Sequence, residues 1–153
     1  MLVLVQPELK DLDYRKRLLS DQKTMAFNHD NGGTVDFHKK LWPMWYDLWM
    51  NHPQYYYAYI YDQEEHCYIG EVSYYFEEEY QEYVMNIIIE YCYRHLGKGK
   101  EALLLLCQKA KDNGLRFLCD DIDSQNPAIH LFKQVGFKEV WQKEHVIMLK
   151  KRL

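Results

Sequence analysis

The chain has 153 residues, of which 48% are hydrophobic and 16% aromatic, and its formal net charge is −4. A chain this apolar can offset the entropy of ordering itself, which excludes a disordered or low-complexity protein and indicates one compact domain over residues 1–153. An acidic protein also lacks the broad cationic field that binds a phosphate backbone. Nucleic acid is therefore not an expected partner.

Cysteine and histidine spacing predicts no metal site, because none of the ligand patterns typical of zinc or redox motifs occurs. The cysteines are expected to be reduced and mostly buried; they are Cys67, Cys92, Cys107 and Cys119. The apolar start of the chain ends at Gln6 and Pro7, too early for the core of a signal peptide. No apolar run approaches the length of a membrane-spanning helix. We expect a cytoplasmic protein with no membrane partner.

The N-terminal part of the chain predicts one strand and two helices. Residues 2–5 form a short apolar strand, and leucines at helical intervals predict a helix over 8–20. Turn-forming residues at 28–33 precede an aromatic helix over 37–50, which is kinked or begins near Pro43.

The middle of the chain changes to a strand pattern. Tyr, Val and Ile dominate residues 55–61, 67–76 and 82–89, and acidic turns separate these segments. The pattern predicts three antiparallel strands that follow one another in a meander.

The C-terminal part predicts two helices and three strands. Their expected positions are a helix over 100–113, a strand over 115–119, a helix with Asn126 as N-cap that ends at Gly136, and strands over 138–142 and 146–150. The helical crossover makes the fourth and fifth strands parallel. We therefore expect an α/β (α+β) fold, with a mixed, mostly antiparallel central sheet of about seven strands and helices on both faces.

The segment most informative about chemistry is Arg94-His95-Leu96-Gly97-Lys98-Gly99-Lys100, where a loop leads from a strand into a helix. Backbone N–H groups at a helix start lack intrahelical partners and carry the positive end of the helix dipole, so they can bind phosphate. Gly97 and Gly99 allow close approach, and three basic side chains add positive charge. A phosphate-binding loop is predicted; a simple tight turn is the alternative.

Two other phosphate-binding motifs fit less well. Gly97-x-Gly99-x-x-Ala102 matches a dinucleotide fingerprint, and an acidic residue follows about 20 residues later. In that fold, however, the glycines follow the strand directly, and the preceding strands are not antiparallel. A phosphate-loop NTPase needs Ser or Thr after Gly-Lys, but Glu101 follows Lys100.

The pattern Arg94-x-x-Gly97-x-Gly99 after an apolar strand, together with Asn126 and Gly136-Phe137, resembles the GNAT N-acetyltransferase superfamily. The resemblance covers about two thirds of the chain. It implies a sheet splayed between the fourth and fifth strands, and acetyl-CoA as co-substrate with its pyrophosphate on the loop.

The resemblance also implies the cofactor-binding residues. An unpaired strand edge can hydrogen-bond an extended amide chain, which assigns the pantetheine arm to the backbone of Ile88, Ile89 and Tyr91. The remaining expected cofactor contacts are Arg94, the amides of Leu96, Gly97, Lys98, Gly99 and Lys100, and the side chains of Asn126 and Phe132.

The implied reaction is transfer of the acetyl group to a primary amine of a small molecule or protein, by direct attack through a tetrahedral intermediate. Many superfamily members have a tyrosine where this chain has Phe132, and that tyrosine protonates the departing thiolate. The alternative is therefore a non-catalytic acyl-CoA-binding or regulatory module. A homodimer is also left open.

An amine with a pKa near that of lysine is mostly protonated at neutral pH, so a carboxylate or ordered water must accept a proton. Our first candidates for this role are Glu90 and Asp121, and Tyr91 is the candidate replacement acid. Asp120 is one of several other acids near the expected cleft. The acceptor site is assigned to the loop with Asn28 and His29, and to Glu71 on the third strand.

Overall fold

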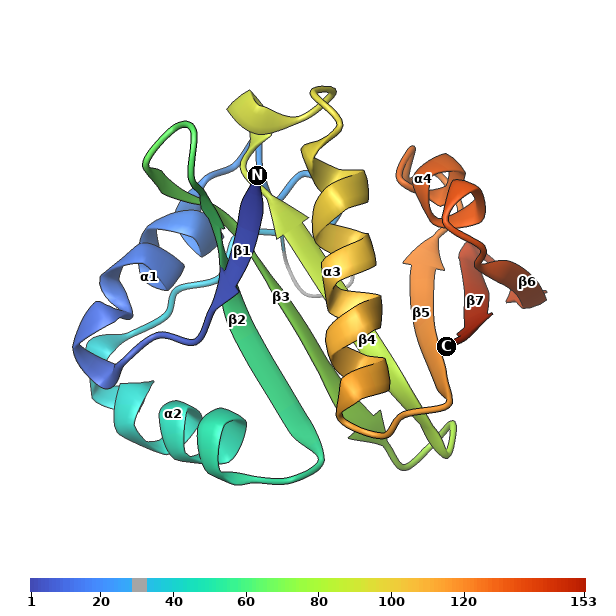
Figure 1. Ribbon diagram of the computed structural model, residues 1–153, viewed down its shortest axis with the longest axis horizontal. Coiled ribbons are helices and arrows are strands. Elements are labelled where there is room, and N and C mark those ends of the chain that lie inside the picture. Colours follow the sequence, from blue (N-terminus) through green and yellow to red (C-terminus); the bar gives the residue numbers. More distant parts are fainter. Residues whose placement is uncertain (29–32) are drawn as a thin grey trace.

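The computed structural model describes residues 1–28 and 33–153, and its centre is a seven-stranded sheet in the order β1-β2-β3-β4-β5-β7-β6 (Figure 1). The strands are β1 (Leu2–Val5), β2 (Tyr55–Asp62), β3 (Cys67–Glu77), β4 (Glu82–Ile89), β5 (Phe117–Asp123), β6 (Lys138–Lys143) and β7 (Val146–Arg152). The α-helices are α1 (Asp13–Ser20), α2 (Trp42–Asn51), α3 (Lys98–Asp112) and α4 (Ile129–Gln134). Neighbouring strands are antiparallel except β4 and β5, which confirms the predicted sheet.

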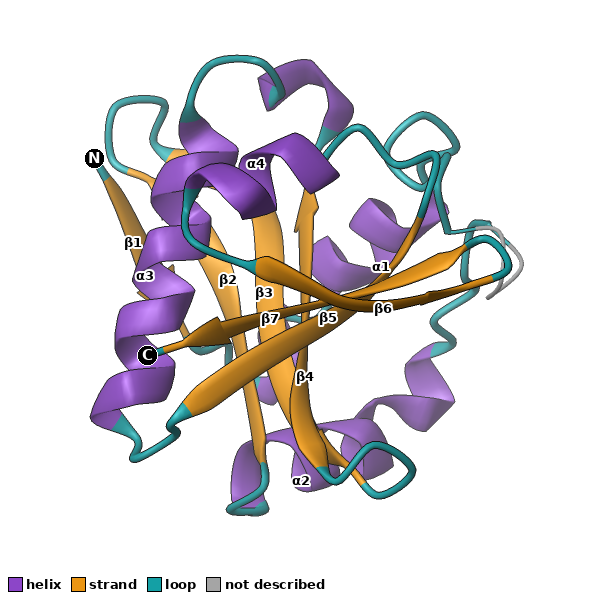
Figure 2. Ribbon diagram, turned by 90° about the vertical axis from the view of Figure 1, so that its right-hand side faces the viewer, coloured by secondary structure: helices purple, strands orange, loops and turns teal. Residues whose placement is uncertain are grey.

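Helices cover both faces of the sheet (Figures 1 and 2). The larger core, under α3 and α4, includes Leu103, Leu106 and Phe132. Side chains of α1 and α2 form two smaller clusters on the other face, where Leu18 packs with Tyr57 and Tyr59 of β2. Among the described helices none is long and apolar enough to cross a membrane.

The strand after α3 begins later than the sequence predicts, because Leu115 completes the cap of the helix. Gly114, at φ 92°, ends α3, and the N–H of Leu115 donates back to Ala110 O at 3.0 Å. Leu115 therefore belongs to the helix cap, and β5 begins at Phe117 and continues to Asp123.

The prediction that Asn126 is the N-cap of α4 is also wrong. The helix begins at Ile129, and Asn126 Oδ1 accepts a hydrogen bond from the N–H of Ala128 at 2.9 Å. Asn126 stabilises the turn that leads into the helix, a use typical of Asn before a helix start.

The first helix is likewise divided. A 3-10 turn at Leu9–Asp11 precedes α1, and the expected single helix over 8–20 becomes these two pieces. Two further 3-10 turns, at Lys39–Leu41 and Tyr91–Tyr93, precede α2 and the loop before α3. Pro43 lies in the first turn of α2, where its missing N–H costs nothing.

The feature that positions the site is the separation of β4 from β5. Strands β3 and β4 pair along eight residue pairs, from Gly70↔Ile89 to Glu77↔Glu82. Strands β4 and β5 are joined at the single pair Val84↔Cys119. Beyond this pair the strands diverge toward their C-terminal ends, and the opening faces the loop that leads into α3 (Figure 1).

Candidate active site

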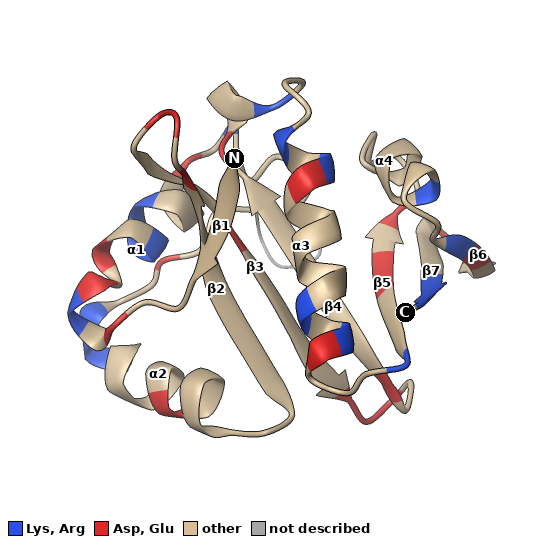
Figure 3. Ribbon diagram, in the orientation of Figure 1, with Lys and Arg blue, Asp and Glu red and all other residues tan. Residues whose placement is uncertain are grey.

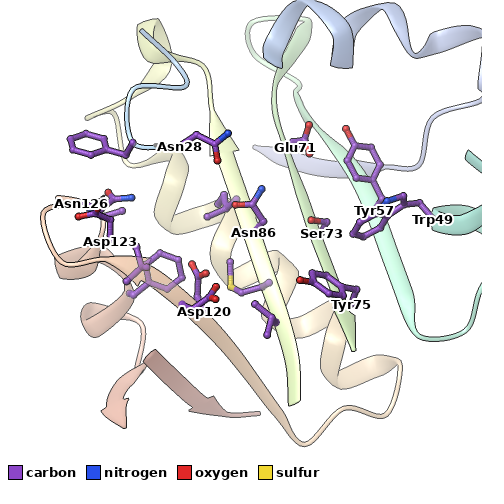
Figure 4. A pocket seen from close by; sticks show the side chains of 18 of the residues that line it. Asn28, Trp49, Tyr57, Glu71, Ser73, Tyr75, Asn86, Asp120, Asp123 and Asn126 are labelled. Carbon is purple, nitrogen blue, oxygen red and sulfur yellow. Dashed lines mark hydrogen bonds between the residues drawn. The ribbon is translucent and has the colours of Figure 1, made fainter. Parts of the chain in front are cut away.

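A cavity of about 360 Å³ lies at the opening between β4 and β5 (Figure 4). Strand β4 contributes Val84, Met85, Asn86 and Ile87, and β5 contributes Asp120, Asp121, Ile122 and Asp123. Asn126, Ala128 and Phe132 close the α4 side, and Arg15, Phe27, Asn28, Trp49, Tyr57, Glu71, Ser73 and Tyr75 line the opposite side. The cavity thus connects the two faces of the sheet through the gap between its strands.

The loop before α3 has the geometry expected of an anion site. Gly97 has φ 79°, a left-handed conformation that favours glycine, and a Cβ there would meet no atom within 4 Å. The first bonded amide of the helix is that of Glu101, which donates to Gly97 O at 3.3 Å. In the described part of the chain, the N–H groups of residues 95–100 have no hydrogen-bond acceptor. This run of free donors at a helix start fits a pyrophosphate.

Two of the three basic side chains of this loop have structural partners. Arg94 Nε donates to Ile89 O at 2.9 Å, and its Nη2 donates to Thr24 O at 2.6 Å. Lys98 forms an ion pair with the buried Asp62, whose pKa it lowers by hydrogen bonding. Lys100 is exposed. The backbone amides and Lys100, rather than Arg94 and Lys98, are therefore the groups available to phosphate.

The pairing of β4 with β3 decides which backbone groups face the opening. Glu90 N–H donates to Ile69 O at 2.8 Å, and the carbonyl of Ile88 lies directly against Gly70 on β3. Because backbone groups alternate in direction along a strand, those of Ile88 face β3 and those of Ile87 and Ile89 face the opening.

The open edge therefore consists of Ile87 and the N–H of Ile89, since the Ile89 carbonyl is bonded to Arg94. The N–H of Tyr91 donates to Thr24 Oγ1 at 3.1 Å and is engaged as well. Sequence reasoning omitted Ile87, although the two-residue period of a strand could have identified it.

Two of the three candidate catalytic residues lie outside the lining of the cavity. Glu90 accepts a hydrogen bond from the Tyr14 hydroxyl at 2.7 Å. Tyr91 is 55% exposed and packs near the ammonium of Lys23, 5.5 Å from its ring centre. Asp121 does line the cavity, where its Oδ2 accepts a hydrogen bond from Tyr80 at 3.2 Å.

Asp120, beside it, is in a different environment. It lines the cavity, and its carboxylate has no hydrogen-bond or ion-pair partner among the described residues. Burial, and secondarily the charge of Asp121, raises the pKa of Asp120 well above its usual value. Sequence reasoning named Asp120 only among the secondary acids, and its isolation is visible only in the folded structure.

The side of the cavity under α1 and α2 contains a row of polar groups. Strand register places Tyr57, Ser73 and Asn86 next to one another on β2, β3 and β4 (Figure 4). Glu71 lies two residues before Ser73 on β3, on the same face of the strand. Its Oε1 accepts a hydrogen bond from Arg15 Nη1 at 2.7 Å. This pair is largely buried, so the Glu71 carboxylate is already engaged with Arg15.

The remaining predicted site residues have these positions. Asn28 lines the cavity and donates from Nδ2 to Gly33 O at 2.7 Å, whereas His29 lies outside the described residues. Asn126 and Phe132 both line the cavity, and the buried Phe132 ring packs edge-on against Phe137 at 5.1 Å between centres. The cavity therefore contains Asn126, Phe132, Asp121, Asn28 and Glu71 of the predicted set.

Charge around the site is unevenly distributed. Figure 3 shows acidic residues on β5 and basic residues around the start of α3. Four carboxylates line the cavity, at Glu71, Asp120, Asp121 and Asp123, against the single guanidinium of Arg15. In the described residues, no group of three or more His, Cys, Asp or Glu side chains is arranged to hold a metal ion.

The fold matches solved acetyltransferases over almost their full length. The GNAT-family acetyltransferase of Streptococcus pneumoniae superimposes with a TM-score of 0.80 at 16% identity, covering 100% of both chains. The yncA protein of Salmonella typhimurium, solved with its cofactor acetyl-CoA, has a TM-score of 0.76 at 16% identity, covering 100% of this chain and 94% of that chain. Ribosomal-protein-alanine N-acetyltransferase of Brucella melitensis has a TM-score of 0.71 at 18% identity, covering 99% of each chain.

At such identities these likenesses establish the fold alone, and a comparison with curated proteins finds no match. The family assignment comes from the sequence model of the acetyltransferase (GNAT) family, which matches residues 17–137. That range contains β4, the loop before α3, β5 and the turn into α4. The chain belongs to the GNAT acetyltransferase family.

Proposed function

We propose that this protein is an N-acetyltransferase that moves the acetyl group of acetyl-CoA to a primary amine. The observation that carries the proposal is the opening of the sheet beyond Val84↔Cys119, with the free amides of residues 95–100 at the same end. The loop supplies donors for a pyrophosphate, and the open edge at Ile87 and Ile89 supplies partners for an extended amide chain. The likeness to yncA, solved with acetyl-CoA, supports the same cofactor.

The chain's own residues divide the work between the two sides of the cavity. The open backbone edge of β4 orients the thioester and offers N–H groups to the negative charge that develops on its oxygen. The row of Tyr57, Ser73 and Asn86 lines the side from which an acceptor enters.

The net negative lining favours a cationic acceptor, since the cavity has more carboxylates than guanidinium groups. Asp121, on that side, is our candidate for accepting the proton of the amine. The non-catalytic acyl-CoA-binding module remains the competing proposal, because Phe132 cannot donate a proton.

The first test is thermal unfolding with acetyl-CoA. At 100 times its dissociation constant, acetyl-CoA should stabilise the protein by about 2.7 kcal/mol, and NADH should not. Gly97→Val should remove this stabilisation, because a branched side chain strains the left-handed turn and obstructs the amides.

Gly114→Val is the matched control. Gly114 has φ 92° and open space around it, like Gly97, but lies at the other end of α3. It should lower stability by a similar amount and keep the response to acetyl-CoA. Stabilisation by NADH alone would contradict the proposal.

The second test separates an enzyme from a binding module. A panel of small primary amines and lysine-containing peptides is incubated with acetyl-CoA, and release of the CoA thiol is measured. Amine-dependent thiol release supports the transferase. Tight acetyl-CoA binding without release for any amine supports the module.

A further inference from the structure

The structure contains an isolated acid at the point where β4 and β5 separate. Val84↔Cys119 is the last pair that joins them, and Asp120 is the next residue of β5. An amide chain that enters from the phosphate loop and follows Ile89 and Ile87 therefore approaches Asp120 with its far end. In the proposed function, that end carries the thioester.

Strand geometry determines the face on which the Asp120 side chain lies. The pairing of β5 with β7 is continuous from Phe117 to Asp123, so side chains alternate regularly between the two faces. Leu118 and Ile122 belong to the core under α3 and α4, which includes Phe132. Asp120 shares their face, whereas Asp121 lies on the opposite face of the sheet, the face on which α1 and α2 pack against β3 and β2.

The surroundings of Asp120 favour the uncharged form of its carboxyl. Met85 and Phe132 line the same cavity, as do the polar side chains of Asp123 and Asn126, and Leu149 is the register partner of Asp120 on β7. The charged group that bears on it is Asp121, and like charge adds to burial in raising the pKa of Asp120. A carboxyl held in its protonated form can act as an acid at neutral pH.

We infer that Asp120 is the catalytic acid of this protein and protonates the departing CoA sulfur, the role that Phe132 cannot perform. The inference rests on the proposed function. The amine nitrogen bonds to the acetyl carbon, the carbon–sulfur bond breaks, and its electron pair passes to sulfur. The sulfur takes the Asp120 proton, while the amine gives its proton to a base or water on the opposite face. Asp120 then regains a proton from solvent.

The division of roles follows from the two adjacent carboxyls. Asp120 is half-buried, forms no hydrogen bond or ion pair with the described residues, and lies on the α4 face. Asp121 is exposed and accepts a hydrogen bond from Tyr80 on the opposite face. An acid whose pKa is raised by its environment can serve as proton donor beside a second carboxyl that serves as base.

The kinetic test uses Asp120→Asn in single-turnover assays with acetyl-CoA and the most active amine of the panel. We expect the rate to fall about 100- to 10,000-fold, the usual contribution of a general acid, with the acetyl-CoA dissociation constant within a factor of two. The single-turnover rate of the parent should fall as pH rises through the pKa of Asp120. The pH–rate profile of Asp120→Asn should lack this decrease.

Rescue distinguishes a proton donor from a residue that only shapes the cavity. Adding Phe132→Tyr to Asp120→Asn should raise the rate at least 10-fold above that of Asp120→Asn alone, because a phenol then lies on the same side of the cavity. Asp112→Asn, an exposed carboxyl at the end of α3, is the control and should behave like the parent. An unchanged rate in Asp120→Asn overturns the inference. So does a slower variant whose rate still falls at high pH and is not raised by adding Phe132→Tyr.

A second readout needs no turnover. The carboxyl carbon of Asp120, labelled with ¹³C and assigned by its loss in Asp120→Asn, should report a protonated acid at pH 7 and should shift when CoA is added. CoA binding without any shift contradicts the inference alone. Failure of CoA to bind the parent contradicts the proposed function, and the inference with it.

Discussion

The two sides of β4 differ sharply. Toward β3 the strand is paired at eight positions, and Gly70 fits so closely that a Cβ would lie 2.0 Å from Ile88 O. Toward β5 it is paired once, at Val84↔Cys119, and a cavity follows. The same apolar strand therefore packs into the sheet along one edge and borders a cavity along the other.

The two sides of β4 also differ in how their charged and polar groups are stabilised. On the β3 side, the buried charges of Glu71 and Arg15 are paired with each other. On the β5 side, Asp120 and the backbone of Ile87 lack protein partners in the part of the chain that the structure describes. Substitutions on the β3 side, the closed side, should therefore lower stability. Substitutions on the β5 side, the open side, should change ligand binding or catalysis and can even stabilise the protein.

The largest expected effect on stability is at Glu71. Its side chain is 4% exposed, and Arg15 is enclosed by the rings of Phe37, Trp45 and Tyr57. Glu71→Gln leaves this guanidinium buried without an opposite charge, and should lower the free energy of unfolding in urea by about 3–5 kcal/mol. Asp36→Asn, at the exposed pair with Lys16, should cost about 1 kcal/mol or less. Equal losses of unfolding free energy in the two variants would mean that the buried pair on the closed side stabilises the protein no more than an exposed pair.

Gly70→Ala should have the next largest effect. The added methyl meets backbone, which cannot rotate away as a side chain can, so β3 and β4 must separate locally. Overpacking of this kind costs about 1–3 kcal/mol, or more, in urea unfolding. Gly114→Ala, where a Cβ meets nothing within 4 Å, is the control without a steric clash; its cost is the strain of a left-handed backbone at φ 92°, about 1 kcal/mol. If Gly70→Ala lost no more than this control, the close contact of the two strands would not be the cause.

The smallest effect should have the opposite sign. Because the folded-state pKa of Asp120 is raised, ionisation of this carboxyl opposes folding, and stability is lost as pH rises through that pKa. Asp120→Asn should therefore melt higher than the parent above this pH, and should show no advantage near pH 4. Each unit of pKa shift is worth about 1.4 kcal/mol, or about 3 °C in a domain of this size. A variant that melts lower at all pH values would contradict an uncompensated acid.

The sequence predicts the fold well because strand and helix periods are strong here, and because Gly97 and Gly99 mark the loop. It does not separate Asp120 from Asp121. The predicted strand ended at Cys119, which placed both acids after the strand, whereas the true strand continues to Asp123 and directs them to opposite faces. The distinction depends on the cap at Leu115, which shifts the strand along the chain.

The partners of the basic loop residues were also beyond the sequence. Asp62 and Thr24 are 36 and 70 residues from Lys98 and Arg94, and no local spacing relates them. Only the sheet order, which brings the ends of β2 and β4 to one side, makes these contacts predictable.

Thr24 has a consequence for the order in which ligands bind. Its Oγ1 accepts a hydrogen bond from the Tyr91 N–H and its carbonyl accepts one from Arg94, so the segment leading to Asn28 is fastened to the loop before α3. In the proposed function, a nucleotide that fixes the loop at residues 95–100 would also fix the neighbouring wall of the cavity, which includes Asn28, through the same bonds. The nucleotide then carries the entropy cost of ordering that wall, and the amine does not. This gives the proposed enzyme a physical reason to bind the nucleotide first and the amine second.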